Sequence, residues 1–429
     1  MSPAITTTFR SLKVRNYRLF ASGQVVSLSG TWAQRVAQDW LVLELSHNSG
    51  VALGITTGLQ FLPMLLFGLY GGVLADRYDK RRLLIWAQVS MGLLALALGL
   101  LDLTDVVQLW HVYALAFLLG LASVIDTPVR QAFVVEMVGA DDLPNAVSLN
   151  SATFNVSRIL GPAVAGLAIN SVGTAPVFLA NAASYVAVVV GLLAIRRADL
   201  FDVHRVARAK GQLREGLDYV RANPELYVPI ALIAVIGMFG LNFQITLALI
   251  AKQTFHLGAG SYGALSAMLA TGSLLGALGS ARRSTPPSSR ILFGSALAFG
   301  LLEVLTGLAP TYFLMAVLLV PTGAAVLTFT TTANATVQLT SAAHMRGRVM
   351  ALYVLVFLGG TPLGAPVIGA VAEVLGPRSS LLIGGVVSAA AAVLAGLYLQ
   401  RVRASGTSGD QQLATRRPPT GTAVGRTTA

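Results

Sequence analysis

The feature that most constrains this chain is a series of hydrophobic runs, each about twenty residues long, along nearly its whole length. A bilayer core of about 30 Å is crossed by about 20 mostly apolar helical residues. The sequence therefore predicts an all-α integral membrane protein of about 12 transmembrane helices. The predicted spans are residues 17–45, 51–75, 83–101, 109–131, 146–170, 175–195, 226–251, 261–281, 291–308, 312–337, 348–374 and 379–399.

Composition agrees with a membrane as the solvent. Hydrophobic residues make up 55% of the 429 and charged residues only 11%, which is more apolar than a soluble domain hides. The chain has no cysteine, which excludes disulfides, a thiolate nucleophile and a cysteine metal site. Because the first run contains Gln24, Arg35, Gln38 and Asp39, it is less apolar than a signal-peptide core and we expect it to be retained as a span.

The positive charges predict the topology. The formal net charge is +12, and 26 of the 30 Lys and Arg residues fall on one side if the N-terminus is cytoplasmic. Lys252 and Arg378 lie near the outer face, while Arg35 and Arg158 fall within spans. This positive-inside pattern predicts a multi-pass protein of a bacterial-type inner (plasma) membrane with both termini cytoplasmic. Since the charge is explained by topology, we expect membrane lipid and no nucleic acid as a partner.

The long basic break at residues 196–225 divides the spans into two groups of six. The predicted domains are residues 1–195 and 226–400, each a six-helix bundle, joined by a cytoplasmic linker over 196–225. Helical spacing of apolar residues in the linker predicts a short amphipathic helix on the membrane surface. The tail, residues 401–429, is rich in Gly, Ser, Thr and Pro, so we expect it to be disordered.

A repeat relates the two groups. An offset of 203 residues aligns Ser157, Gly161 and Gly166 in the fifth span with small residues of the eleventh, namely Gly360, Gly364 and Gly369. Both segments run in the same direction, as a parallel repeat of two pseudosymmetric halves requires. Chance recurrence of small residues in membrane helices is the alternative explanation.

The loop after the second span carries a specific motif. Residues 72–82 read GVLADRYDKRR and resemble the major facilitator superfamily signature G-x-x-x-D-R-x-G-R/K-R/K, with Asp79 where the family has glycine. The small Gly72 is expected to permit close helix approach, and Asp76 to meet a helix N-terminus or a basic partner. The resemblance implies the major facilitator fold and transport by alternating access. The residues assigned to this inner gate are Gly72, Asp76, Arg77, Lys80 and Arg81, with Asp126 and Arg130 at the end of the fourth span.

The resemblance also implies how this gate works. In related transporters an acidic residue at the position of Asp126 joins the signature loop in a charge network, so Asp76, Lys80 and Asp126 are the expected partners. Such a network would hold the outward-facing state and break as the halves rock. A static set of interfacial salt bridges is the alternative, and exposed pairs contribute less than about 1 kcal/mol.

Residues 157–166, SRILGPAVAG, resemble the antiporter motif G-x-x-x-G-P-x-x-G-G, with Ser157 and Ala165 in place of two glycines. Tight packing can survive these small substitutions, and Pro162 can bend the helix. The motif residues are Ser157, Gly161, Pro162 and Gly166, and the resemblance favours export over import.

Shorter matches narrow the resemblance to the branch that contains enterobactin exporters and macrolide efflux proteins. They are GTW at 30–32, AQDWLV at 37–42, LREGL at 213–217 and RGRV at 346–349, and the similarity covers most of residues 8–400. The basic residue that many proton antiporters carry early in the fourth span is absent, since Ala116 and Phe117 stand there. Proton coupling by that residue is therefore not supported.

Four charged residues fall within predicted spans: Arg35, Asp39, Arg158 and Glu303. Even insertion scales assign about 2.5–3.5 kcal/mol to a central Arg or Asp, so such groups usually face protein or a wet cavity. Asp39 or Glu303 is a candidate proton carrier, and Arg35 and Arg158 are candidates for an anionic substrate. The structural alternatives are an Arg35–Asp39 pair and a Glu303 near the outer surface.

The sequence predicts a secondary active transporter, not an enzyme, that exports an amphiphilic small molecule such as a drug, siderophore or other natural product. We find no H-E-x-x-H, G-x-x-x-x-G-K-S/T or G-x-S-x-G motif, so no catalytic residue, metal or cofactor is expected. The proton gradient is the expected energy source and a monomer the expected state. An importer, an uncoupled facilitator and a transport-dead scaffold or sensor remain the alternatives.

Overall fold

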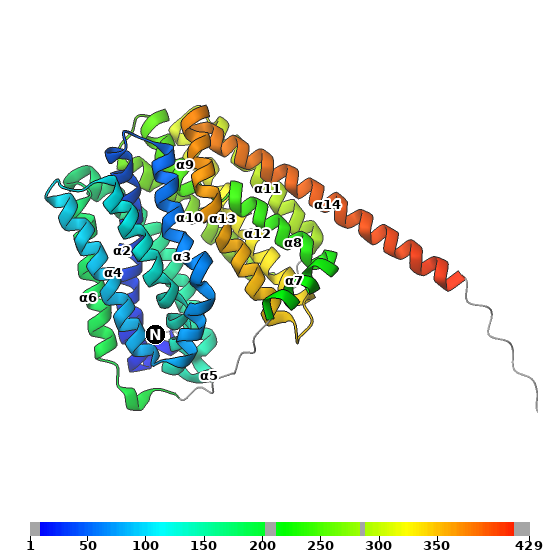
Figure 1. The fold of residues 1–429 in the computed structure, drawn as a ribbon, viewed down its shortest axis with the longest axis horizontal. Helices are drawn as coiled ribbons and strands as arrows, with labels where there is room; N and C mark the ends of the chain where they lie inside the picture. Colours follow the sequence, from blue (N-terminus) through cyan, green and yellow to red (C-terminus); the bar gives the residue numbers. More distant parts are fainter. Residues whose placement is uncertain (1–8, 202–211, 284–287, 416–429) are drawn as a thin grey trace, which may run out of the picture.

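The computed structural model describes residues 9–201, 212–283 and 288–415, and every element in these ranges is helical. The helices form two bundles side by side, which we call the N half and the C half (Figure 1). The N half contains η1 (Arg10–Lys13), α2 (Arg15–Leu45), α3 (Gly50–Arg77), α4 (Lys80–Leu103), α5 (Leu109–Val172), α6 (Ala175–Leu193) and η2 (Arg197–Asp199). The C half contains α7 (Gln212–Ala222), α8 (Pro224–Phe239), α9 (Phe243–Leu249), η3 (Ile250–Thr254), α10 (Ala259–Ala281), α11 (Ser289–Leu308), α12 (Tyr312–Thr340), α13 (Arg346–Leu375) and α14 (Pro377–Thr415).

The predicted spans correspond to these helices. In the described part of the chain, 10 helices are long and apolar enough to cross a membrane, counting Pro224–Thr254 as one. The 64-residue α5 holds two predicted spans, because Gly139 interrupts it with non-helical dihedrals of φ 71° and ψ −178°. Glycine is needed there, since a side chain would be strained at this φ and would press on the ring of Phe201. The remaining predicted span is α2, which carries Arg35 and Asp39.

The seventh predicted span is broken in its middle. Helix α8 ends at Phe239, and α9 begins only at Phe243. The amides of Gly240 and Leu241 both donate to the carbonyl of Ile236, and the Asn242 side chain donates to the Met238 carbonyl at 2.7 Å. These bonds satisfy backbone groups at the end of α8 that a continuous helix would satisfy itself. Broken membrane helices of this kind commonly border ligand sites.

The glycine repeat acts alike in both halves. A Cβ on Gly161 would lie 2.7 Å from the Ser29 carbonyl oxygen of α2, and one on Gly364 would meet the Met238 carbonyl of α8. Each contact lies within one half. The last glycine of each set faces the other half, Gly166 against Gly260 of α10 and Gly369 against Gly50 of α3. The repeat therefore marks where α5 and α13 pack on both bundles.

We expect Gly364→Ala to lower thermal stability, because its methyl group would be forced into the backbone of Met238. Overpacking of this kind typically costs about 1–3 kcal/mol. Gly294→Ala is the matched control, since a Cβ there meets nothing within 4 Å and helix propensity improves by about 1 kcal/mol. The midpoint of thermal aggregation in detergent should fall for the first variant only. Equal midpoints would show that the close approach is not limiting.

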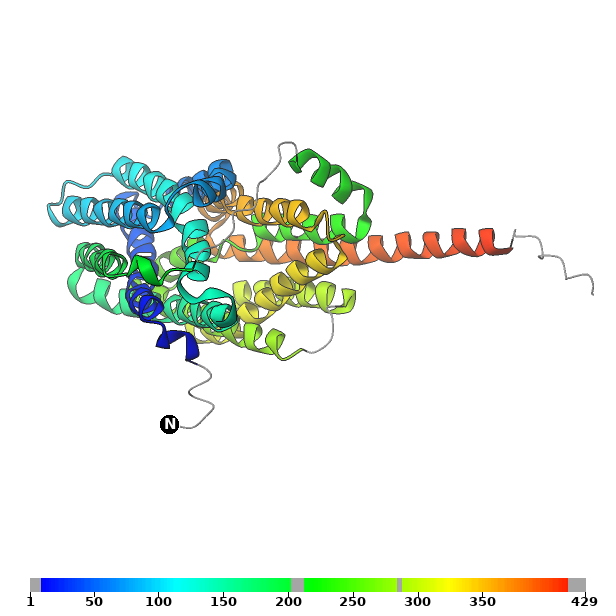
Figure 2. The same ribbon diagram turned by 90° about the horizontal axis from the view of Figure 1, so that it is seen from below.

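The linker and tail differ in part from the prediction. Helix α7 lies in the predicted linker and packs on the start of α13, where Glu215 pairs with Arg348 at 2.5 Å and Val220 is 2% exposed. Residues 202–211 lie outside the described residues. The predicted disordered tail began at 401, whereas α14 continues to Thr415 and projects beyond the bundle (Figure 2). Residues 416–429 are outside the described part.

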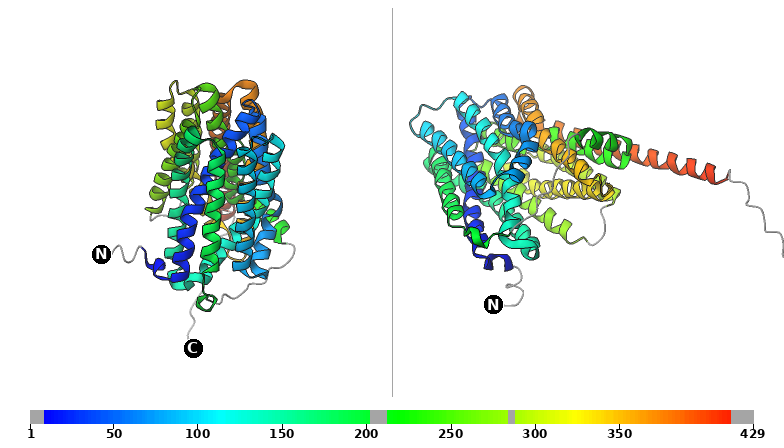
Figure 3. Two further views of the ribbon diagram at one scale, coloured as in Figure 1. Left: turned by 90° about the vertical axis from the view of Figure 1, so that its left-hand side faces the viewer. Right: turned by 60° about the horizontal axis from the view of Figure 1, so that its bottom comes forward.

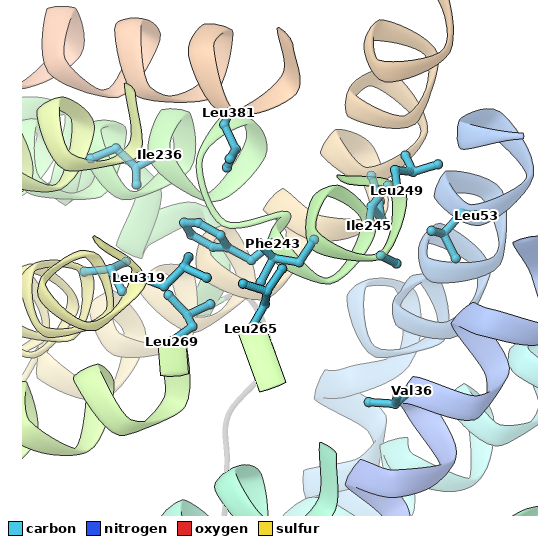
Figure 4. Packing of buried hydrophobic residues seen from close by; sticks show 14 of the residues in the cluster. Val36, Leu53, Ile236, Phe243, Ile245, Leu249, Leu265, Leu269, Leu319 and Leu381 are labelled. Atoms are coloured by element: carbon cyan, nitrogen blue, oxygen red, sulfur yellow. The ribbon is translucent and has the colours of Figure 1, made fainter. Parts of the chain in front are cut away.

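The apolar core is continuous between the halves at one end of the molecule. Figure 4 shows Phe243 of α9 near Leu265, Leu269 and Leu319 of the C half, while Leu249 lies beside Leu53 of α3. All of these side chains are buried. Toward the end that carries the N-terminus and α7 the two bundles diverge (Figures 1 and 3). We call the first end the closed end and the second the open end.

Candidate functional site: a cationic cavity between the two halves

A cavity of about 300 Å³ lies between the halves, beside the break in the α8–α9 helix. Its walls come from α2, α3 and α5 of the N half and from the α8–α9 break, α9, α10, α12 and α13 of the C half. Most of the lining is apolar or aromatic, with a few polar groups. The lining residues used below are Trp32, Arg35, Phe61, Arg158, Pro162, Leu241, Asn242, Phe243, Gln244, Tyr262 and Phe357.

Two arginines give the cavity a positive charge. The guanidinium carbon of Arg35 lies 4.6 Å from the ring centroid of Trp32, and that of Arg158 lies 5.8 Å from the same ring. Arg35 also lies 5.6 Å from the ring of Phe61. In the described part of the chain neither arginine forms an ion pair within 4.0 Å, and Nε of Arg35 is buried with no hydrogen-bond partner. Aromatic faces offset only part of the cost of such charges.

Asp39 lies behind the cavity wall and links the two halves. Its carboxylate is fully buried and accepts a 2.6 Å hydrogen bond from the hydroxyl of Tyr262, which lines the cavity from α10. The Gln244 side chain also interacts with Asp39, although neither the other oxygen of Asp39 nor Nε2 of Gln244 forms a hydrogen bond within 3.5 Å among the described residues. Arg35 is one turn away on α2 but does not pair with Asp39, so the predicted alternative of an Arg35–Asp39 ion pair is wrong.

The closed end is held by hydrogen bonds between the halves. The Glu373 carboxylate of α13 accepts from the Ser49 hydroxyl at 2.6 Å and from the Val51 amide at 2.9 Å, which places it at the N-terminus of α3. Gln253 donates to the Asn48 carbonyl at 2.5 Å, and the Gly260 amide donates to the Asn170 side chain at 3.3 Å. The close backbone contacts of Gly50 and Gly166 lie at the same end.

We expect Glu373→Ala to loosen the closed end, because it removes the negative charge that α13 places beside the N-terminus of α3. A carboxylate at an exposed helix N-terminus contributes about 0.3–1 kcal/mol, so the population opened at this end should rise roughly two- to five-fold. Spin labels on Thr104→Cys and Pro310→Cys, one per half, report the distance. Ser49→Ala is the control that keeps the Val51 bond and should shift the distances less. Unchanged distances in Glu373→Ala would contradict a latch at this position.

The predicted inner-gate residues lie toward the open end and do not form one network. Lys80 pairs with Glu136 at 2.6 Å, whereas Asp126 accepts from Gln88 at 2.6 Å and pairs with Arg130 at 3.2 Å. Asp76 is exposed and joins none of the described ion pairs. The expected Asp76–Lys80–Asp126 network is therefore not assembled in this conformation, in which the halves diverge at this end.

Other signature residues have local roles. Arg81 donates two 2.7 Å hydrogen bonds to the carbonyls of Leu192 and Leu193 at the end of α6, and Arg77 is exposed. A close helix approach occurs at Gly71, the residue before Gly72, where a Cβ would collide with the Val124 carbonyl of α5. The approach expected at Gly72 itself stays a prediction.

Glu303 is not part of the cavity, contrary to the prediction that groups it with the other intramembrane charges. It is 2% exposed on α11, a helix that packs against α12 and α14 and contributes no residue to the cavity lining. Its side chain is enclosed by protein, whereas the alternative of a position near the outer membrane surface stays a prediction. The spacing of apolar residues along a helix does not show which neighbouring helix its single acidic residue faces.

The antiporter-like segment joins α2 to α10. Ser157 accepts a 3.1 Å hydrogen bond from Ser29, and Gly161 packs against Trp32 and Ser29. On the other face, Pro162 lines the cavity and its carbonyl meets Gly263. Small residues at these positions let α5 contact both halves at the edge of the cavity.

Sequence reasoning missed several residues of the site. Tyr262, Gln244 and Asn242 lie in apolar runs where single polar or aromatic residues give no distinct signal. Glu373 falls near the end of a predicted span, where an acidic residue is expected to be exposed to solvent. The Gly240–Leu241–Asn242 sequence was the available signal for the broken helix, because glycine and asparagine commonly end helices.

Comparison with known proteins agrees with this architecture. The family model described as transmembrane secretion effector matches residues 6–420. The chain is 27% identical over 265 residues to the staphyloferrin A transporter of Staphylococcus aureus, a match covering 61% of this chain and 66% of that protein, just under two thirds of its length. It is 24% identical over 395 residues to macrolide efflux protein A of Streptococcus pyogenes, covering 88% and 94% of the two chains.

A similar fold occurs among solved structures. A bacterial homologue of the human lysosomal transporter Spinster, in an inward-facing and unoccupied conformation, superposes with a TM-score of 0.72 at 14% identity, covering 89% of this chain and 96% of that one. At this identity the likeness concerns the fold alone. Together with the match to nearly the whole chain, it shows that this protein belongs to the transmembrane secretion effector family and is a multi-pass membrane transporter of the major facilitator type.

Proposed function

We propose that this chain exports an anionic amphiphilic small molecule across the plasma membrane by alternating access, in exchange for protons. The observation that carries the proposal is the cavity between the halves, where Arg35 and Arg158 lie against Trp32 without an acidic partner among the described residues. The efflux named for one relative, macrolide efflux protein A, supports export. Both termini and the open end are assigned to the cytoplasm from the basic loops.

Charge balance supports an anionic substrate. Arg35 and Arg158 with an ionised Asp39 leave a net charge of +1 around the cavity, and a buried charge is costly unless it is paired. A carboxylate, sulfonate or phosphate group can form charge-assisted hydrogen bonds with both guanidinium groups. The aromatic and aliphatic lining, including Phe61, Phe243 and Phe357, suits the apolar remainder of the molecule.

The two unequal ends support alternating access. The cavity is sealed on the closed end by the Glu373, Gln253 and Gly260 hydrogen bonds between the halves. Export requires those bonds to break while the halves close at the open end. There Asp76, Lys80 and Asp126 would approach the C half, so the inner-gate network remains a proposal for the outward-facing state.

Asp39 is the proposed proton carrier. Ionised, it accepts a charge-assisted hydrogen bond from Tyr262, which holds α2 to α10 on the closed side of the cavity. A proton on Asp39 weakens that bond and lowers the cost of separating the two helices. The carboxyl thereby connects the proton gradient to the closed end.

The charge of the cavity also favours one alternative mechanism. Moving an elementary charge through 100 mV changes its free energy by about 2.3 kcal/mol, so a membrane potential negative inside already drives an anion outward. An uncoupled facilitator would therefore export the same class of molecule.

Liposomes that contain the full chain separate these mechanisms. An imposed pH gradient is combined with potassium and valinomycin to set the potential to zero, while movement of an anionic fluorophore, 1-anilinonaphthalene-8-sulfonate, and internal pH are recorded. Oppositely directed dye and proton fluxes that stop when the pH gradient is collapsed support antiport. Dye movement that follows only the potential selects the facilitator, and no protein-dependent movement of anionic, neutral or cationic probes would refute transport of an amphiphile.

A further inference from the structure

The buried Glu303 lies on the opposite side of the α8–α9 break from the cavity. A Cβ built on Gly240 would lie 3.2 Å from Oε2 of Glu303 and 2.7 Å from Oγ of Ser388, so both oxygens face the same point of the break. A Cβ built on Gly384 would lie 2.9 Å from Oε1 of Glu303 and 2.7 Å from the Phe239 carbonyl oxygen. The carboxyl is thus enclosed by α14 and by the last residues of α8.

Among the described residues, no ion pair stabilises a negative charge on this carboxyl, and its Oε2 accepts no hydrogen bond. Glu303 is 2% exposed and Ser388 is 0% exposed, and Oε2 of the first and Oγ of the second lack hydrogen-bond partners among the described residues. No described ion pair involves Glu303. An unpaired carboxylate in this environment costs several kcal/mol, which a bound proton removes.

The charged groups on the surrounding helices are occupied elsewhere. Arg378 donates to the Gly307 carbonyl, and Glu225 pairs with Arg403. The ionisable residues on the elements packed against Glu303 are Arg290 on α11, Glu225 and Tyr227 on α8, Lys252 on η3, Tyr312 on α12, and Arg378, Tyr398, Arg401 and Arg403 on α14. None of these cations forms an ion pair with Glu303 within 4.0 Å.

The end of α8 favours the protonated form of Glu303. The last carbonyls of a helix carry partial negative charge, so the neighbouring Phe239 carbonyl disfavours a carboxylate and favours a group that donates a hydrogen bond. A protonated Glu303 is such a donor. The following residues, Leu241 and Asn242, line the cavity, so the carboxyl contacts the break from behind the cavity wall.

We infer that Glu303, together with Ser388 and the Phe239 carbonyl, forms a second proton-binding site, separate from the cavity and placed at the α8–α9 break. The proton binds on the carboxyl group and leaves it as the break rearranges. The role of this site in transport rests on the proposed function, whereas proton binding itself is measurable without any transport.

Infrared difference spectroscopy on the full chain in liposomes tests the site. The carbonyl stretch of protonated carboxyl groups is followed from acid to alkaline pH in choline chloride and again in sodium chloride. The isosteric Glu303→Gln variant should lose one titrating band, Ser388→Ala should shift that band, and Asp39→Asn should leave it in place. Asp102→Asn, which changes a half-buried carboxyl hydrogen-bonded to Thr174 within the N half, is the control for an unrelated acid.

Three results would overturn the inference. Glu303→Gln could lose no band, in which case Glu303 is ionised throughout, or it could lose a band that never titrates, in which case Glu303 is a permanently neutral structural acid. Disappearance of the band on adding sodium at fixed pH would make the site one for a metal cation. A titrating Glu303 band in a protein that shows no proton-coupled flux would reject the proposed coupling and leave the proton site intact.

Discussion

Asp39→Asn is expected to abolish the response of transport to a pH gradient while exchange of substrate across the membrane continues. Asparagine is close in size to aspartate, but its amide side chain does not gain or lose a proton over the pH range of the assay. Under the proposed mechanism, this variant moves substrate only down its own electrochemical gradient. Liposome assays with and without the imposed pH gradient, at zero potential, measure the difference.

The same variant should also shift the conformational equilibrium. The 2.6 Å bond from Tyr262 to Asp39 joins the halves in a buried position, and hydrogen bonds to charged groups contribute about 1.5–3 kcal/mol. Its weakening should raise the population opened at the closed end by roughly ten- to one-hundred-fold.

Because the natural chain has no cysteine, spin labels can be introduced without first removing native thiols. The pair Thr104→Cys and Pro310→Cys reports the closed end, and Ala140→Cys with His344→Cys reports the open end.

Tyr262→Phe separates the two roles of this link. It removes the donor but keeps the carboxyl, so the closed end should loosen while dependence on the pH gradient remains. The double variant Asp39→Asn with Tyr262→Phe should loosen the closed end little more than Tyr262→Phe alone, since both replacements act on the same bond. Asp102→Asn, whose carboxylate accepts from Thr174 inside the N half, should change neither readout. Retention of full gradient dependence in Asp39→Asn would reject Asp39 as the carrier.

The helical architecture was predictable because the physics that fixes it is local. Span length follows from bilayer thickness, so all the predicted spans correspond to described helices. The Gly139 turn within α5 also falls between two predicted spans. The repeat of Gly161 and Gly364 was visible because close backbone contact demands small residues at fixed spacing.

The site was predictable only in part. Arg35 and Arg158 stand out in any apolar run, since intramembrane charge is costly and usually faces a cavity. The partner of Asp39 could not be found in this way, because Tyr262 is an ordinary residue in an apolar helix and the bond joins residues 223 positions apart. The pairing of Lys80 with Glu136 depends likewise on the fold of α5 back along α3 and α4.

Replacing both Arg35 and Arg158 by glutamine is expected to remove selective binding of anions. Each side chain places a guanidinium against Trp32 in the cavity, and each charge-assisted bond to an anion contributes about 1.5–3 kcal/mol. The affinity for 1-anilinonaphthalene-8-sulfonate should therefore fall roughly ten- to one-hundred-fold for each single replacement. Quenching of tryptophan fluorescence in the full chain, in which Trp32 reports the cavity, provides the measurement.

A neutral probe of the same shape distinguishes charge from packing. N-phenyl-1-naphthylamine lacks the sulfonate, so its binding should be unchanged in the arginine variants if these residues recognise negative charge. Lys252→Gln is the matched control, because Lys252 lies 4.6 Å from the ring of Trp40 but is not among the cavity-lining residues. It should leave both probes unaffected.

The outcomes assign the cavity to one class of substrate. If only 1-anilinonaphthalene-8-sulfonate binds more weakly to the arginine variants, the two guanidinium groups select anions. Substrate screens should then use amphiphiles that carry a carboxylate or sulfonate group. An equal loss of affinity for both probes would mean that the arginines determine the shape of the cavity but do not recognise the charge of the ligand. If neither probe loses affinity, the anion proposal fails, because two buried cations that bind an anion cannot be removed without weakening that binding.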